Sequence, residues 1–167
     1  MSETFQEQPP PFKIHNRTGS VNVTFTPTHF DGETFTSQKG EVRILKKGYL
    51  MIEMANASGP GENRSKTVYD WAGKVAMKLS DPDIHQILAG LRGEPCQIVH
   101  DPNKARAEGG DEGTLPKSCL QVSKGERFGW FMTMSRGERK AKCPLNDSDA
   151  ATLRLLLERA VIRIFGW

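Results

Sequence analysis

The sequence is poor in cysteine and lacks any long apolar run. Only three cysteines occur among its 167 residues. They are Cys96, Cys119 and Cys143, with neither CxxC spacing nor a histidine at zinc-finger distance from a pair, which favours free thiols in a reducing compartment over a zinc site. No stretch approaches the about 18 apolar residues of a membrane-spanning helix. We therefore expect no metal, no cofactor and no membrane partner.

Motifs of the common enzyme classes are also missing. The sequence has no GxSxG, no HExxH and no phosphate-binding loop. Asp81, Asp83 and Asp101 could suggest a metal-dependent nuclease, but the first two fall at an expected helix start, where capping and the helix dipole explain them. We expect no enzymatic activity.

The overall charge is small and excludes little by itself. Charged residues make up 26% of the chain, and the net charge is +3. These values are typical of a folded globular protein, and the length suits a single domain with a sizeable core. The proline-rich start predicts a disordered segment over residues 1–12 and one domain over residues 13–167. That start resembles neither a secretory signal nor a transit peptide, so we expect a cytoplasmic location.

What the sequence does contain is short runs of alternating apolar and polar residues, the pattern of half-buried strands. Four strands are predicted before a short helix: one over residues 20–26, a hairpin over residues 40–56 that turns at Lys47-Gly48, and one over residues 69–79. Four more follow, over residues 96–100, 115–123, 127–135 and 138–144. No strand-helix alternation occurs, so the fold class is α+β with largely antiparallel sheets.

Two helices are predicted from caps and from apolar residues at three- and four-residue spacing. Ser80 caps the first, which covers residues 81–91 and has Pro82 in its first turn. Asn146 or Asp147 caps the second, at the end of the chain. The apolar positions of the second helix are Leu153, Leu156, Leu157, Ala160, Val161, Ile164 and Phe165.

The run YDWAGKVAMKL, residues 69–79, is the most informative strand. As one strand it places Tyr69, Trp71, Val75, Met77 and Leu79 on one face, and Asp70, Lys74 and Lys78 on the other. The apolar face suits a sheet core, and for Trp71 a core position is favoured over base stacking. The lysine face suits either solvent or a polyanion.

The order of several short motifs resembles the Whirly family of single-stranded DNA-binding proteins. These motifs are YDW at residues 69–71 with Lys74 and Leu79 after it, HDP at residues 100–102, and the closing GW at residues 166–167. The resemblance covers residues 18–167. It implies two four-stranded antiparallel sheets that cross each other, a short helix after strand 4 and a C-terminal amphipathic helix. It also implies a homotetramer that binds single-stranded DNA with little sequence preference.

The sequence departs from the family pattern in two places. The family's KGKAAL-type segment corresponds here to TGSVNV, residues 18–23, which keeps Gly19 but neither lysine, so higher-order assembly is in doubt. No organelle leader of the plant type is recognisable, which favours a bacterial or phage-infected cell. Related architectures include RNA-binding proteins, so the resemblance does not exclude RNA.

Single strands are held by cations on phosphates and by aromatic rings on bases. Tyr49 lies beside lysines on the outward face of its strand, and Phe128 and Trp130 alternate with Arg127. Between Lys117 and Lys142 basic residues far outnumber acidic ones, while His100 is interpreted as a hydrogen-bonded strand end. The predicted nucleic-acid-binding residues are Lys46, Lys47, Tyr49, Tyr69, Lys74, Lys78, Lys117, Arg127, Phe128, Trp130, Arg139 and Lys142.

The sequence thus predicts a protein that coats single-stranded DNA in replication, recombination or repair. Two alternatives stay open. One is an RNA-binding or annealing protein, since stacking platforms accept either sugar. The other is a transcription cofactor that acts mainly through protein contacts.

Overall fold

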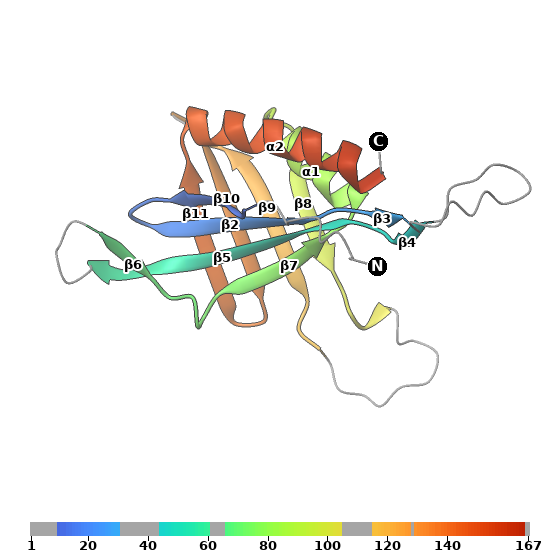
Figure 1. Ribbon diagram of the computed structural model, residues 1–167. Coiled ribbons are helices and arrows are strands. Elements are labelled where there is room, and N and C mark those ends of the chain that lie inside the picture. The colour runs from blue at the N-terminus through green and yellow to red at the C-terminus, as the bar shows by residue number, and fades with distance from the viewer. Residues whose placement is uncertain (1–9, 31–43, 61–65, 105–114, 128, 166–167) are drawn as a thin grey trace, which may run out of the picture.

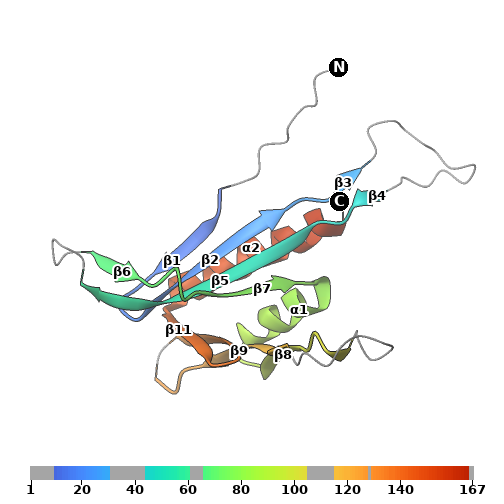
Figure 2. The same ribbon diagram turned by 90° about the horizontal axis from the view of Figure 1, so that it is seen from below.

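Two antiparallel sheets cross each other face to face, with two helices beside them (Figures 1 and 2). A computed structural model describes residues 10–30, 44–60, 66–104, 115–127 and 129–165. The predicted α+β class with crossing antiparallel sheets is confirmed. No helix in the described ranges is long and apolar enough to cross a membrane.

The first sheet is built around one long strand, β5. Its five strands are β1 (Phe12–His15), β2 (Gly19–Thr26), β5 (Tyr49–Pro60), β6 (Thr67–Tyr69) and β7 (Val75–Leu79). The order is β1-β2-β5, and β6 and β7 both pair with β5. Alternate residues of β5, Leu50, Ile52 and Met54, are buried, as the period of two requires.

The hairpin predicted over residues 40–56, with its turn at Lys47-Gly48, is wrong. The strand β4 (Ile44–Lys46) pairs with β3 (His29–Phe30), and β5 pairs with β2, so the hairpin joins residues 19–30 to residues 44–60. Gly48 breaks the second arm without reversing it. A Cβ on Gly48 would lie 2.6 Å from the Thr26 carbonyl oxygen, so this break requires glycine. Alternation reveals strands but not their partners.

The strand predicted over residues 69–79 is also interrupted. Residues 70–74 form a turn in which the Gly73 amide donates to the Asp70 carboxylate at 2.9 Å. After the turn, Val75, Met77 and Leu79 are buried as predicted. Trp71 is outside the core and only partly buried, so its predicted core position is wrong.

The N-terminal strand β1 was not predicted. Phe12, which the sequence placed in a disordered segment, begins β1, and Ile14 is buried in the core. Four residues of alternation were too few to mark a strand beside a proline-rich run. Residues 1–9 lie outside the described part of the chain.

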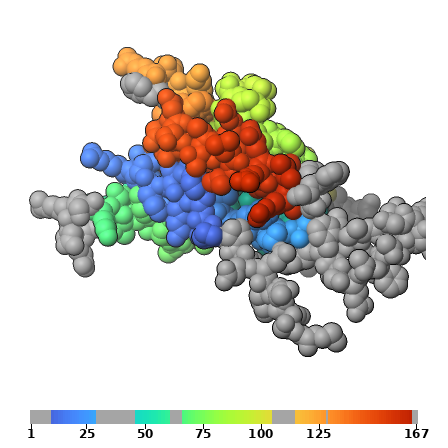
Figure 3. All heavy atoms as spheres, turned by 45° about the horizontal axis from the view of Figure 1, so that its top comes forward, coloured from blue at the N-terminus to red at the C-terminus, as the bar shows by residue number. Residues whose placement is uncertain are grey.

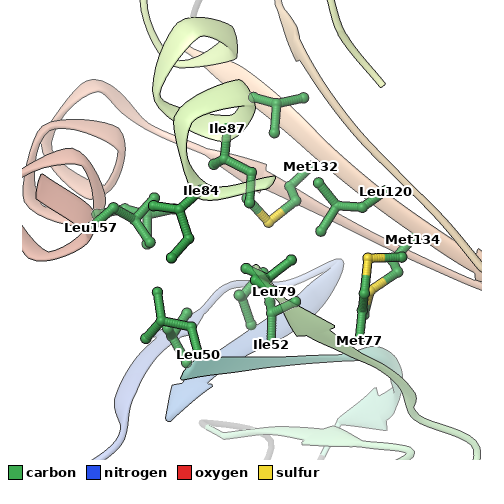
Figure 4. Packing of buried hydrophobic residues seen from close by; sticks show 14 of the residues in the cluster. Leu50, Ile52, Met77, Leu79, Ile84, Ile87, Leu120, Met132, Met134 and Leu157 are labelled. Atoms are coloured by element: carbon green, nitrogen blue, oxygen red, sulfur yellow. The ribbon is translucent and has the colours of Figure 1, made fainter. Parts of the chain in front are cut away.

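The second sheet forms as predicted from four consecutive strands. They are β8 (Cys96–His100), β9 (Ser118–Lys124), β10 (Trp130–Arg136) and β11 (Arg139–Leu145), in the order β11-β10-β9-β8. Its inner face carries Leu120, Met132 and Met134 against the inner face of the first sheet (Figure 4). The two faces thus share one core.

The helices begin where the sequence indicated. Ser80 caps α1 (Asp81–Gly90) in a capping box with Asp83, and Ile84 and Ile87 point into the core (Figure 4). Asn146 caps α2 (Asp147–Phe165) by accepting from the Asp149 amide at 2.8 Å. Leu156, predicted as an apolar packing position, is 41% exposed.

The sheets are joined where β5 passes the edge strand β11. The Asn56 side chain donates to the Lys140 carbonyl at 2.7 Å and accepts from the Lys142 amide at 3.1 Å, as a strand backbone would. Gly19 lies beside this joint, and a Cβ there would be 2.3 Å from the Lys142 carbonyl oxygen. The geometry of this crossing therefore needs a glycine at the start of β2.

All three cysteines are free thiols. Cys96 and Cys143 are buried, whereas Cys119 is partly exposed on the second sheet. Burial raises the pKa of Cys143 to about 11, against a hydrogen bond from the Asn16 amide that lowers it. Cys143 is therefore a protonated, unreactive core thiol at neutral pH.

Candidate nucleic-acid interface

A groove follows the edge of β7 that faces away from β5. Three adjoining hollows of about 380, 480 and 520 Å³ make up this β7 groove. Lys78 and His100 line both the first and the second hollow, and Ala76, Pro116 and Arg136 line both the second and the third. The shared residues show that the three hollows adjoin one another in a row along β7.

One end of the groove combines an aromatic ring with cations. The Lys78 ammonium lies 4.1 Å from the centroid of the Tyr49 ring, a cation-π contact. Lys47 lines the same hollow and pairs with Asp81 at 2.6 Å. Tyr49 is therefore a partly exposed ring held in place by a lysine, which suits a base-stacking platform with a phosphate contact beside it.

His100 lines the middle of the groove. The Nε2 atom of His100 lies 3.1 Å from Oδ2 of Asp83. The same oxygen accepts from the Ser80 amide at 2.7 Å and from the Ser80 hydroxyl at 2.6 Å. The capping box of α1 thus positions a groove residue.

The other end of the groove is basic. Lys74, Arg136 and Arg139 line the third hollow. Lys74 pairs with Glu53 at 2.5 Å, and this hydrogen bond is the main cause that lowers the Glu53 pKa. Glu53 therefore remains charged well into the acidic range.

Lys117 lies beside the groove and pairs with a groove residue. Its ammonium is 2.9 Å from the carboxylate of Asp101, which lines the second hollow. The hydrogen bond from Lys117 lowers the pKa of Asp101. Lys117 is next to Pro116 in the chain, so it can reach an occupant of the groove.

Tyr69 is placed elsewhere, in an aromatic stack at the far part of β5. Its ring stacks on His15 with centroids 5.2 Å apart and meets Trp71 edge-on at 6.4 Å. Its hydroxyl donates to the Asn16 carbonyl at 2.8 Å. Burial raises the pKa of Tyr69, which stays a neutral phenol. Tyr69 does not line the β7 groove.

Three other predicted residues lie on the second sheet or its loops. Lys142 covers the Phe131 ring at 4.5 Å, and Lys124 lies 5.9 Å from the Trp130 ring. The Trp130 indole nitrogen is buried and has no hydrogen-bond partner among the described residues. Arg127 is exposed in the loop before β10, and Phe128 lies outside the described residues. Trp130 lies on the same side of β10 as the buried Met132 and Met134 and packs against the core, so its predicted contact with nucleic acid is not supported. None of the described residues in this set lines the groove.

The structure therefore gathers part of the predicted set. Lys47, Tyr49, Lys74, Lys78 and Arg139 all line the β7 groove. Lys46 is exposed at the end of β4, and the remaining described members lie beside the groove or away from it.

Two groove residues were missed by sequence reasoning. Arg136 ends β10 and reaches the groove because the β10-β11 turn folds back toward β7. His100 was interpreted as structural, although the HDP motif marked its position. Only the crossing of the sheets brings these two residues together.

The comparison with protein families decides the identity of the fold. Residues 14–154 match the family model described as "Whirly transcription factor". The chain belongs to the Whirly family. This confirms the resemblance seen in the sequence.

Two plant Whirly proteins are similar in sequence. The chain is 24% identical over 136 residues to the chloroplastic single-stranded DNA-binding protein WHY3 of Arabidopsis thaliana, covering 78% of this chain and 48% of that protein. It is 31% identical over 134 residues to the chloroplastic single-stranded DNA-binding protein WHY1 of Solanum tuberosum. This match covers 77% of this chain and 46% of that protein. This Whirly chain therefore spans about half the length of these curated relatives.

Solved Whirly structures share the fold. WHY1 from Arabidopsis thaliana superposes with a TM-score of 0.73 at 20% identity, covering 94% of this chain and 85% of that one. The plant transcriptional regulator PBF-2 superposes with a TM-score of 0.74 at 22% identity. This match covers 100% of this chain and 94% of that one. At this identity the match establishes the architecture.

The predicted cytoplasmic setting in a bacterial or phage-infected cell is wrong. Both curated relatives are chloroplastic proteins of plants, which points away from that setting. The prediction rested on the composition of the first residues, which does not determine the compartment of this Whirly chain.

Proposed function

We propose that this Whirly protein binds single-stranded DNA in the β7 groove, as a binding protein and not as an enzyme. One observation carries the proposal: the three adjoining hollows of the groove are lined by Lys78, Arg136 and Tyr49. Cations that displace counterions and a ring that stacks on a base are the two means by which proteins hold single strands. The names of the two similar plant proteins, both single-stranded DNA-binding proteins, support it.

The protein acts as a homotetramer in this proposal. The side chains of Leu155 and Ile162 are 63% and 53% exposed, and their spacing of one heptad puts them on one side of α2. Figure 3 shows α2 lying across the molecular surface. Exposed apolar residues on one helix side suit contact with another copy. The number of four copies is taken from the resemblance to the Whirly family.

We place the activity in DNA replication, recombination or repair, where exposed strands need cover. A role in transcription is the second candidate. It is favoured by the family description "Whirly transcription factor" and by the fold match to a plant transcriptional regulator. RNA binding is an outcome of the test below, because the groove offers contacts to phosphates and bases that both nucleic acids carry.

The test is fluorescence anisotropy of labelled oligo-dT, with oligo-U and a duplex as competitors, at two salt concentrations. We expect tight binding to oligo-dT that weakens with salt. Lys78→Ala and Arg136→Ala each remove one phosphate contact, so each should lower affinity about fivefold at 0.1 M salt and reduce the salt slope by about 0.7.

Arg92→Ala is the matched control, because Arg92 is exposed beyond α1 and lines no part of the groove. It should bind as the parent protein does. Unchanged affinity in both groove variants would refute the groove as the site. Preference for oligo-U would favour the RNA alternative, and absence of binding to any probe would favour protein contacts.

A further inference from the structure

His100 stands at the point where two hollows of the groove meet. It lines both the first and the second hollow, a position that it shares with Lys78. Its side chain is 40% exposed, whereas that of Asp83, its partner, is 10% exposed. His100 is therefore open to an occupant of the groove on one side and tied to a nearly buried carboxylate on the other.

The hydrogen bonds define how the ring is protonated. A carboxylate oxygen accepts hydrogen bonds, so the neutral imidazole keeps its proton on Nε2, which faces Asp83 at 3.1 Å. The second proton is then taken up at Nδ1. Protonation does not break the contact with Asp83 but converts it into an ion pair.

We propose that His100 is a proton-controlled binding residue of the β7 groove, which strengthens the hold on single-stranded DNA as the pH falls. This inference rests on the proposed function and adds to it a regulation by pH. With a neutral ring, the carboxylate of Asp83, which lies directly behind His100, keeps its negative charge near the groove without a cationic partner among the described residues. Proton uptake cancels that charge, which favours a polyanion.

The surroundings of His100 hold charges of both signs. Lys47 faces it from the segment between β4 and β5, and Lys78 from β7. Asp81 and Asp83 face it from α1, Asp101 from the end of its own strand and Arg136 from β10. Among the described residues that line the two hollows, the remaining titratable side chain is that of Tyr49. Lys47 pairs with Asp81 and Lys117 with Asp101. Among the described residues that line these two hollows, His100 carries the imidazole, the side-chain type that proteins use as a pH switch.

The direction of the effect follows from linkage. The protonated form binds the strand more tightly, so affinity rises as the pH falls. One added unit of positive charge is equivalent to about one phosphate contact. The expected gain is therefore about fivefold at 0.1 M salt, and the salt slope should steepen by up to about 0.7.

The experiment is oligo-dT anisotropy at pH 5.5 and pH 8.0 at constant ionic strength. The parent protein should bind about fivefold more tightly at pH 5.5. His100→Gln keeps a donor toward Asp83 but does not titrate, so its affinity should be the same at both pH values. His100→Arg carries a permanent charge and should bind tightly at both.

His85→Gln serves as the matched control, since His85 is exposed on α1 and lines neither hollow. It should keep the full response to pH. A response of parental size in His100→Gln, or a parent protein whose affinity does not change with pH, would overturn the role of His100 while leaving the proposed function intact. Absence of oligo-dT binding at both pH values would overturn the two together. Thermal melting of each variant shows whether it is folded. If His100→Gln does not fold, His100→Arg still tests the proposal.

Discussion

At the scale of single residues, three of the lysines in or beside the groove are paired with carboxylates. Lys47 contacts Asp81, Lys74 contacts Glu53 and Lys117 contacts Asp101. These lysines are 57%, 42% and 63% exposed, whereas their partner carboxylates are only 14%, 20% and 11% exposed. Each largely buried carboxylate therefore holds an exposed lysine in place along the groove.

Gly19 gives a prediction about a single residue. Gly19→Ala would bring a Cβ to 2.3 Å from the Lys142 carbonyl oxygen and 3.0 Å from that of Ala55. Because both neighbours are backbone atoms, the sheets must shift, and we expect a loss of roughly 1 to 3 kcal/mol in unfolding free energy. Urea denaturation measures it.

Thr18→Ala is the control for this substitution, since Thr18 is exposed and precedes Gly19. It should change stability by less than about 0.5 kcal/mol. If Gly19→Ala were as stable as Thr18→Ala, the close approach of β2 to β11 would not be a constraint on the fold.

At the scale of elements, the parts of the fold that depend on neighbouring residues were predictable. Ser80 and Asn146 marked both helix starts, because a cap acts within one turn. The pairing of β4 with β3 and the turn between β6 and β7 were not predictable, because alternation gives faces but not partners. The same limit applies to the site: the sequence named Tyr49 and Lys78, but only the crossing of the sheets adds Arg136.

Asn56 gives a prediction about how elements are joined. Asn56→Ala removes both hydrogen bonds to β11, and we expect a loss of about 1 kcal/mol because the site is exposed. Asn56→Asp keeps an acceptor for the Lys142 amide but loses the donor to the Lys140 carbonyl. It should be no more stable than Asn56→Ala in chemical denaturation. A variant Asn56→Asp as stable as the parent would show that the donor bond does not hold the sheets together.

At the scale of the whole molecule, the exposed apolar side of α2 predicts assembly. The parent protein should have the mass of four chains of 18.6 kDa each in light scattering after gel filtration. Leu155→Asp combined with Ile162→Asp places charges on that side and should yield monomers, because unpaired charges are expensive to bury.

Arg154→Ala changes a different side of the same helix, where Arg154 lies 4.0 Å from Glu158. This control should keep the mass of the parent protein. A parent protein that is monomeric, or a double variant that still forms tetramers, would show that α2 does not carry the assembly.

The open edge of β7 has a consequence for solubility. Among the described strands β7 pairs only with β5, so its other edge presents unpaired backbone groups, which is the feature that seeds aggregation between sheets. Lys74 and Lys78 lie along that edge, and lysine is a residue with which proteins protect such strands. A strand from another copy would bring its own lysines and be repelled. A polyanion is not repelled in this way. In the proposed function, the same lysines therefore attract nucleic acid and prevent pairing between the β7 edges of two copies.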